Sequence, residues 1–223
     1  MFLSNFMMSR SVFSHISRIP MKQVNLIMRA SKNTKSIHLF IREPRGVNQI
    51  NYVNHLNNPN IPLILGIGPT GTGKTLFACT TAVKELQNGT IDKIVLTSPV
   101  VPAEEDVGHL PGSLFHELNP WTRPIFDILE EYYSLREIDS MIHSGTIEFS
   151  PLTFMRGRTF KNSFIIADEM QNSSPDQMCM LVTRLGQGSR MVITGDLKQS
   201  DRPDDNGLLD LLHKIKHHNR IVP

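Results

Sequence analysis

The chain has 223 residues, enough to bury the core of one domain, and its 39% hydrophobic and 20% charged residues exclude an intrinsically disordered protein. No stretch approaches the roughly 18 uninterrupted apolar residues of a membrane span, so we expect no membrane partner. The two cysteines lie far apart and outside any CxxC or Cys/His pattern, which argues against a disulfide framework or a zinc site and favours a reducing compartment.

The net charge of +2 conceals an asymmetry between the two parts of the chain. Residues 1–42 hold seven Lys or Arg and no acidic residue, which leaves 16 basic and 21 acidic side chains, a balance of −5, in the remainder. A strongly basic nucleic-acid-binding body is therefore not expected. We interpret residues 1–42 as a basic extension and residues 43–223 as the folded domain.

The basic extension permits two interpretations. It is rich in Ser, Met, Phe and Arg and has apolar residues at helical spacing, a composition typical of a mitochondrial transit peptide. The alternative is an ordinary, poorly ordered extension, with Met21 as the real start of the protein. We expect a cytoplasmic protein, with a mitochondrial location as the alternative.

From about residue 60 onward, segments of strand and helix character alternate. Short apolar runs predict strands, and apolar residues at intervals of three and four predict helices. This alternation indicates an α/β fold, with a mostly parallel sheet covered by helices on both faces. The expected strands are Ile61–Ile67, Ile94–Thr97, Ile147–Phe149, Phe164–Ala167 and Met191–Thr194. The expected helices are Lys74–Leu86, Trp121–Ile142, Pro175–Leu185 and a last one around Leu208–Ile215.

Residues 68–75 match the phosphate-binding loop pattern G-x-x-x-x-G-K-[ST] in full. The glycines allow unusual backbone dihedrals, so that successive N–H groups and the positive end of the following helix can face an anion. Lys74 is expected to reach the β- and γ-phosphates of a nucleotide, and the hydroxyl of Thr75 to help hold Mg²⁺. An ordinary Gly/Thr-rich turn is the alternative, but the motif follows an apolar strand and opens a helix, as the loop requires. The predicted nucleotide-binding residues are Gly68, Pro69, Thr70, Gly71, Thr72, Gly73, Lys74 and Thr75.

Two carboxylates directly follow the apolar run Phe164–Ala167. Ligands of parallel α/β sheets sit beyond the carboxyl ends of the strands, which is where Asp168 and Glu169 are expected to emerge. We predict that Asp168 orients Mg²⁺, usually through water, and that Glu169 polarises the attacking water as a general base. The alternative is a surface Asp-Glu pair that caps the next helix.

Polar residues also follow the strand expected at Met191–Thr194. Thr194, Asp196 and Gln199 are predicted at the same sheet edge as the acidic pair. The amide of Gln199 can donate to a γ-phosphate and accept from water, so Gln199 is a candidate catalytic residue. By itself G-D-x-x-Q describes an ordinary turn, and its position after the other two motifs favours the catalytic interpretation.

The chain resembles the PhoH-like family of P-loop ATPases in five segments: GPTGTGKT, SPVVPAEEDVGHLPG, LTFMRGRTF, FIIADEMQN and TRLGQGSRMVITGDLKQ. That family is similar to the first motor domain of superfamily 1 helicases, whose DEAQ and GDxxQ boxes match Asp168–Gln171 and Gly195–Gln199. The resemblance covers about residues 43–212. It implies a RecA-like fold, ATP with Mg²⁺ as cofactors, and work on RNA or single-stranded nucleic acid.

Two further residues are candidates for the site, Gln49 from the resemblance and Arg158 from its position just ahead of the strand Phe164–Ala167. Gln49 lies where such proteins carry an upstream glutamine that reads the adenine edge, and a primary amide suits this role because it donates and accepts at once. Arg158 can stabilise the transition state of phosphoryl transfer or hold an RNA phosphate, with a solvated basic turn as the alternative. In a chain with one motor domain this arginine would act from a neighbouring subunit, so we expect a homo-oligomer such as a ring.

The chain departs from the family pattern in what it lacks. We see neither a second motor domain nor a PIN-type nuclease domain, and the sequence stops at Pro223, before the Arg-bearing segment usual in the family. Our first hypothesis is a Mg²⁺-dependent ATPase that works on RNA. The alternative is a nucleotide-switched binding protein with negligible turnover. A small-molecule kinase shares the P-loop but fits the DEMQ and GDLKQ boxes poorly.

Overall fold

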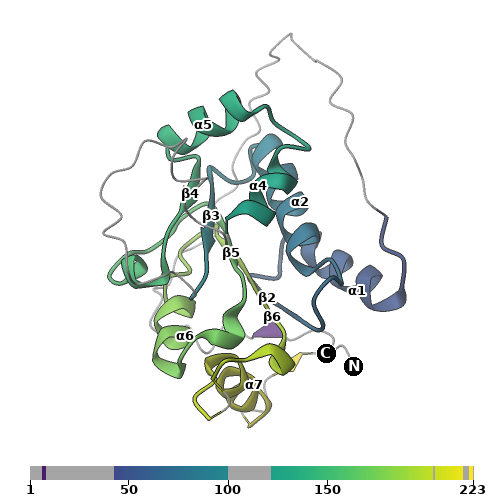
Figure 1. Ribbon diagram of the computed structural model, residues 1–223, viewed down its shortest axis with the longest axis vertical. Coiled ribbons are helices and arrows are strands. Elements are labelled where there is room, and N and C mark those ends of the chain that lie inside the picture. Colours follow the sequence, from purple (N-terminus) through teal and green to yellow (C-terminus); the bar gives the residue numbers. More distant parts are fainter. Residues whose placement is uncertain (1–6, 9–42, 100–121, 203, 218–220, 223) are drawn as a thin grey trace.

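The computed structural model describes residues 7–8, 43–99, 122–202, 204–217 and 221–222 (Figure 1). Apart from two residues, the basic extension lies outside this part of the chain, and so do both interpretations of its role and location. Most of the SPVVPAEEDVGHLPG segment lies outside it as well. Among the described residues, no helix has the length and apolar character needed to cross a bilayer.

Five parallel strands form the central sheet, in the spatial order β2-β6-β5-β3-β4 (Figure 1). All five predicted strands are confirmed, with small shifts at their ends. Because β6 lies between β2 and β5, the carboxyl ends of these three strands lie next to one another. A separate antiparallel pair joins β1 (Met7–Met8) to β7 (Ile221–Val222). The strands of the main sheet are β2 (Leu63–Ile67), β3 (Lys93–Thr97), β4 (Ile147–Phe149), β5 (Ser163–Ala167) and β6 (Arg190–Gly195).

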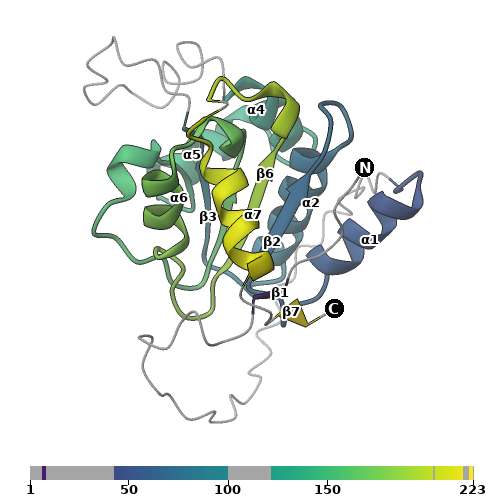
Figure 2. The same cartoon turned by 90° about the horizontal axis from the view of Figure 1, so that it is seen from below.

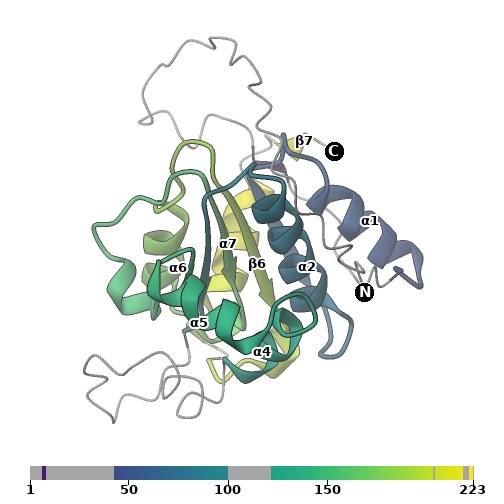
Figure 3. The same ribbon diagram turned by 90° about the horizontal axis from the view of Figure 1, so that it is seen from above.

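Helices cover both faces of the sheet, as the alternating sequence pattern predicts (Figure 2 and Figure 3). Every residue of β2, β5 and β6 is buried, which explains their continuous apolar sequences. One face packs against α1, α2, α4 and α5 around a core that includes Phe77, Ile94 and Phe164. The other face packs against α6 and α7, with Met178 and Leu212 in its core. The helices are α1 (Val47–Leu56), α2 (Lys74–Gln87), α4 (Arg123–Leu129), α5 (Leu135–His143), α6 (Pro175–Val182) and α7 (Gly207–His217), with the 3₁₀ turns η2 (Leu152–Met155), η3 (Met170–Asn172) and η4 (Leu197–Gln199).

The single helix predicted for residues 121–142 is wrong, because this region holds two helices, α4 and α5. The chain leaves α4 after Leu129, and Ser134, in an extended conformation, begins α5. Ser134 forms a capping box with Glu137, in which each residue accepts a hydrogen bond from the backbone N–H of the other. The apolar spacing runs across this break, so only the local Ser-x-x-Glu signal indicates it.

Local signals place other helix ends correctly. Pro175 occupies the first turn of α6, and Ser174 caps that helix in a capping box with Gln177. The Asn88-Gly89 pair follows the end of α2, where Gly89 has a φ of 68°. Residues adjacent in sequence set these ends, and the predicted start of α6 and the predicted end of α2 are both confirmed.

Helix α1, which precedes β2, is not predicted by the sequence pattern. Only Leu56 among its 10 residues is buried, so α1 lacks the broad apolar stripe that marks an amphipathic helix. It is held instead by a few partly buried side chains, Tyr52 and Val53, that pack on the core around α2. This helix carries Gln49 to the phosphate-binding loop.

Candidate nucleotide-binding site

The loop of residues 68–75 joins the buried strand β2 to α2 and has the backbone geometry of an anion-binding loop. Gly71 and Gly73 have φ values of 77° and 84°, in the left-handed region that glycine adopts without strain. Gly73 is also the N-cap of α2, and a Cβ at this position would come within 3.0 Å of the Phe77 ring. The loop therefore leads into the N-terminus of a 14-residue helix, whose free N–H groups and positive dipole end favour a phosphate.

The ammonium group of Lys74 lies against the backbone of this loop. Its Nζ donates to the carbonyl oxygens of Gly68 at 2.8 Å and Pro69 at 2.9 Å, and the residue is buried. A phosphate in the loop would compete for the same donors, and a contact between two charged groups is stronger than one to a neutral carbonyl. Two carbonyl oxygens of the loop thus hold the side chain of Lys74 at the loop. Its role in nucleotide binding stays a prediction.

Asp168 joins three elements of the site. Its Oδ1 accepts a hydrogen bond from Thr75 Oγ1 at 2.9 Å and a second, short one from Thr194 Oγ1. Thr75 lies in the first turn of α2, Asp168 follows β5, and Thr194 is near the end of β6. The strand order brings them together, because β6 is inserted between β2 and β5. The predicted proximity of these residues at one sheet edge is what the structure shows.

The Thr75–Asp168 pair has the chemistry of a magnesium site shared with a nucleotide. Mg²⁺ prefers hard oxygen ligands and is commonly held by one or two protein groups together with phosphate oxygens and water. A hydroxyl and a carboxylate oxygen 2.9 Å apart at the start of α2 fit this requirement. In the described part of the chain, no group of three or more His, Cys, Asp or Glu side chains is placed to hold a metal ion. Any magnesium held by this pair would therefore take its other ligands from phosphate oxygens and water.

Glu169, the candidate general base, has an unusual backbone conformation. Its φ of 56° and ψ of 34° lie in the left-handed region, which is uncommon for residues other than glycine. Its Oε2 accepts a hydrogen bond of 2.6 Å from the amide of Gln171. Glu169 is the N-cap residue of the following 3₁₀ turn η3, but its side chain makes no capping hydrogen bond there, and α6 is capped by Ser174 and Gln177. The alternative that the two carboxylates cap the next helix therefore does not describe their contacts.

The third motif reaches the phosphate-binding loop directly. Thr70 Oγ1 donates to Gln199 Oε1 at 2.8 Å, although the two residues are 129 positions apart in sequence. Asp196 begins η4, and its carboxylate accepts the backbone N–H of Lys198 at 3.0 Å. Gln199 is therefore in contact with the loop, and its role toward a γ-phosphate stays a prediction, while Asp196 caps η4.

Helix α1 contacts the phosphate-binding loop through two side chains. Gln49 Nε2 donates to Thr72 O at 3.0 Å, and its Oε1 accepts the backbone N–H of Arg45 at 2.6 Å. Tyr52, one turn further along, donates its hydroxyl to Lys74 O at 3.0 Å. Burial raises the pKa of Tyr52 well above its ordinary value, so the hydroxyl remains a donor. Adenine recognition by Gln49 stays a prediction; Tyr52 is a contact that the sequence analysis missed, and its spacing of three from Gln49 is the only signal for it.

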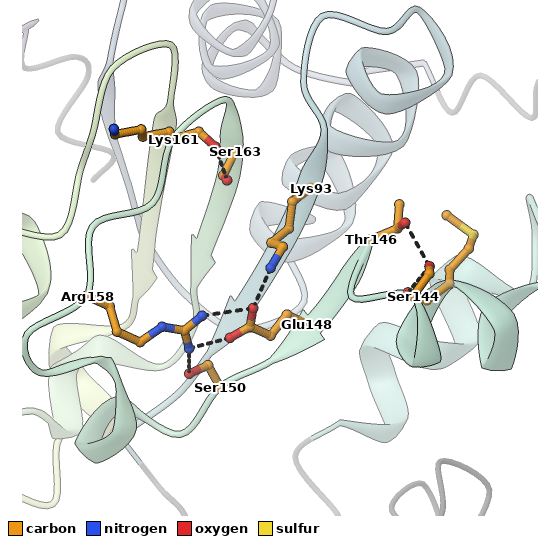
Figure 4. A network of polar contacts seen from close by, with 9 residues as sticks. Lys93, Ser144, Thr146, Glu148, Ser150, Arg158, Lys161 and Ser163 are labelled. Carbon is orange, nitrogen blue, oxygen red and sulfur yellow. Dashed lines mark hydrogen bonds and ion pairs between the residues drawn. The ribbon is translucent and has the colours of Figure 1, made fainter.

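Arg158 is engaged within its own chain (Figure 4). Its partner strand β4 and the strand β2, which leads into the phosphate-binding loop, are the two outermost strands on opposite sides of the sheet. The guanidinium of Arg158 forms a bidentate salt bridge with Glu148 on β4 and donates to Ser150 Oγ at 3.3 Å. Lys93 Nζ binds the same carboxylate at 2.8 Å, and Arg158 also stacks over the Phe160 ring, 4.6 Å from its centroid. The alternative that Arg158 is only a solvated basic residue in a turn therefore does not account for these contacts.

This ion-pair network has an electrostatic consequence. Burial alone would raise the pKa of Glu148, but the hydrogen bonds and charges of Arg158 and Lys93 outweigh it, so the pKa is lowered. The charge of Arg158 is thus largely satisfied inside the chain. A contribution of Arg158 to the site of a neighbouring copy stays a prediction, and it would require this network to open.

Comparison with known proteins assigns the chain to a family. The sequence profile of the family described as PhoH-like protein matches residues 41–222. The chain belongs to the PhoH-like family. It is 48% identical over 141 residues to a PhoH-like protein of Bacillus subtilis, an alignment that covers 63% of this chain and 44% of that protein. It is 35% identical over 163 residues to the protein PhoH of Escherichia coli, which covers 71% of this chain and 46% of that protein.

Membership of the PhoH-like family confirms the resemblance drawn from the motifs, and the all-parallel sheet with helices on both faces agrees with a RecA-like P-loop fold. The protein PhoH2 of Bacillus subtilis is 37% identical over 188 residues, covering 80% of this chain and 42% of its own length. The chain thus spans less than half the length of these PhoH-like relatives.

Proposed function

We propose that this PhoH-like chain binds ATP with Mg²⁺ at residues 68–75 and hydrolyses it, and that turnover is coupled to RNA or another single-stranded nucleic acid. The observation that carries the proposal is the meeting of three motifs at one sheet edge. The hydroxyl of Thr75 contacts Asp168, and the hydroxyl of Thr70 contacts Gln199, across 93 and 129 residues of sequence. A structural turn or a surface carboxylate pair would have no reason to converge in this way.

Each side chain has a defined task in this proposal. The loop N–H groups and Lys74 bind the β- and γ-phosphates and orient them. Mg²⁺ held by Thr75 and Asp168 would neutralise the negative charge that develops on the phosphate oxygens. Glu169 would orient the attacking water and accept its proton, while Gln199 would donate to the γ-phosphate.

Replacement of Lys74 by Ala tests nucleotide binding. We expect Lys74→Ala to weaken ATP affinity about 10- to 100-fold, because it removes the charge-assisted contact to the phosphates. Isothermal titration with ATP and Mg²⁺ measures this loss. Lys84→Ala, on the same helix α2 but away from the loop, is the control and should bind ATP like the parent protein. Full affinity in Lys74→Ala would remove the loop from the proposal.

The second candidate function is a nucleotide-switched binding protein with negligible turnover. It uses the same nucleotide site, but Glu169, whose carboxylate accepts a hydrogen bond from Gln171 at 2.6 Å, would not act on water. Steady-state phosphate release, compared with a Glu169→Gln variant, separates the two functions.

An exposed aromatic side chain supports the nucleic-acid part of the proposal. Phe154, in η2 after β4, is 69% exposed, and Arg156 two residues later is exposed as well. Single-stranded nucleic acids bind where bases stack on aromatic rings beside positive charge. We expect Phe154→Ala to weaken single-stranded RNA binding about 5- to 100-fold, measured by fluorescence anisotropy with a labelled oligonucleotide. Leu135→Ala, at an apolar residue 58% exposed on α5, is the matched control, and equal binding by both variants would refute this surface.

A further inference from the structure

Gln171 is almost completely buried and lies between two of the motifs. It is 1% exposed, and both ends of its side-chain amide have a partner. Its Oε1 accepts the backbone N–H of Asp196 at 3.0 Å, and its Nε2 donates to Glu169 Oε2 at 2.6 Å. Its backbone oxygen also accepts the hydroxyl of Ser200 at 2.9 Å. A buried amide whose oxygen and nitrogen each have a hydrogen-bond partner is fixed in one orientation.

The orientation of this amide is dictated by its two neighbours. The backbone N–H of Asp196 can only donate, so the oxygen of Gln171 must face it. The nitrogen is therefore turned toward Glu169, whose ionised carboxylate can only accept. Gly195 leaves the room for this arrangement, because a Cβ there would lie 2.9 Å from Gln171 Oε1 and 2.5 Å from Leu208 Cδ2.

The contacts of Gln171 extend as far as the phosphate-binding loop. Thr70 donates to the side chain of Gln199, whose backbone N–H is bound to Asp196 O at 3.0 Å. Asp196 in turn donates to Gln171, which donates to Glu169. A continuous chain of hydrogen bonds thus runs from the rim of the loop to the candidate base.

We propose that Gln171 is a positioning residue that holds the carboxylate of Glu169 and links its orientation to the segment 195–199. The inference rests on the proposed ATPase function. A γ-phosphate that engages Gln199 would pull on the turn that carries Asp196, and Gln171 would transmit the shift to Glu169. The amide itself touches neither nucleotide nor water in this scheme, since it acts through the carboxylate of Glu169.

The exchange Gln171→Glu isolates the donor, because it keeps the size of the side chain and the acceptor for Asp196. It places a second carboxylate against Glu169, and like charges at this distance repel. We expect kcat for ATP hydrolysis to fall at least about 10-fold, with the Kd for ATP changed less than about twofold. Gln187→Glu, the same exchange at an exposed glutamine, is the control and should leave both quantities at the parent level.

A swapped pair tests the contact without any enzyme assay. Gln171→Glu alone should lower the Tm by about 4–8 °C, and the same exchange in a Glu169→Gln background should recover at least half of this loss, because an amide again faces a carboxylate. Equal losses in both backgrounds would overturn the pairing, and an unchanged kcat in Gln171→Glu would overturn the positioning role. A parent protein without measurable phosphate release, combined with recovery in the swap, would refute the ATPase proposal and leave the pairing established.

Discussion

The Glu169→Gln variant is expected to bind ATP like the parent protein and to release phosphate at least about 100-fold more slowly. Removal of a positioned general base commonly lowers a rate by 10²–10⁴-fold. The amide is the same size as the carboxylate, and its oxygen can still accept from Gln171, so the local structure should be kept. Steady-state phosphate release and ATP titration, made on the same preparation, measure the two quantities.

The outcome of this experiment decides between the two candidate functions. A slow variant with full affinity supports hydrolysis with Glu169 as the base. Equal phosphate release by the variant and the parent protein would instead favour the nucleotide-switched binding protein. Glu130→Gln, at an exposed carboxylate directly after α4, controls for the loss of a negative charge elsewhere.

The Arg190→Met variant is expected to lose about 3–5 kcal/mol of unfolding free energy, because the buried partner of a largely buried ion pair is removed. The side chain of Arg190 is 7% exposed and pairs with Glu85 on α2. It also donates to the carbonyl oxygens of Leu56 at 2.7 Å and Asn58 at 3.0 Å. The carbonyl of Leu56 is in the last turn of α1, where the helix has no further N–H to bind it, and that of Asn58, which also accepts the backbone N–H of Ile61, lies just past the helix end. Arg190 therefore binds α1, the helix that contacts the phosphate-binding loop, to strand β6 of the sheet.

Thermal unfolding should show this loss as a fall in Tm of about 6–20 °C for a chain of this size. Arg202→Met is the control, because Arg202 pairs with Asp205 at the surface, where the side chains are 45% and 61% exposed. Such exposed pairs contribute about 0–1 kcal/mol. A similar fall in both variants would contradict the anchoring role of Arg190.

The stability loss of Arg190→Met should also depend on pH. Burial raises the pKa of Glu85 above its ordinary value of 4.5, and the charge and hydrogen bond of Arg190 act in the opposite direction. Without Arg190 the pKa of Glu85 in the folded protein rises further. The contribution of Glu85 to stability is then complete at pH values below its ordinary pKa, and it is lost as the pH rises through the pKa of the folded protein. Denaturant unfolding should therefore give a larger loss at pH 8 than at pH 5.

The sequence by itself determined the α/β class, the five parallel strands and the three motifs at their carboxyl ends. These features depend on residues close together in the chain, because apolar runs, glycine-rich loops and capping boxes act over a few positions. The prediction of helices failed where the local signal was weak or where a stronger apolar pattern hid it. Apolar spacing continued through the break at Ser134, and α1 had too few buried residues to produce a helical pattern.

Only the tertiary structure decided which distant side chains meet. The strand order placed β6 between β2 and β5, and this insertion brought Thr75 and Thr194 to the same oxygen of Asp168. The same packing gave Arg158 the carboxylate of Glu148 as its partner, at the edge far from the phosphate-binding loop. A motif fixes the chemistry that a residue offers, but the partner of that residue depends on the order in which the strands assemble, which no local pattern encodes.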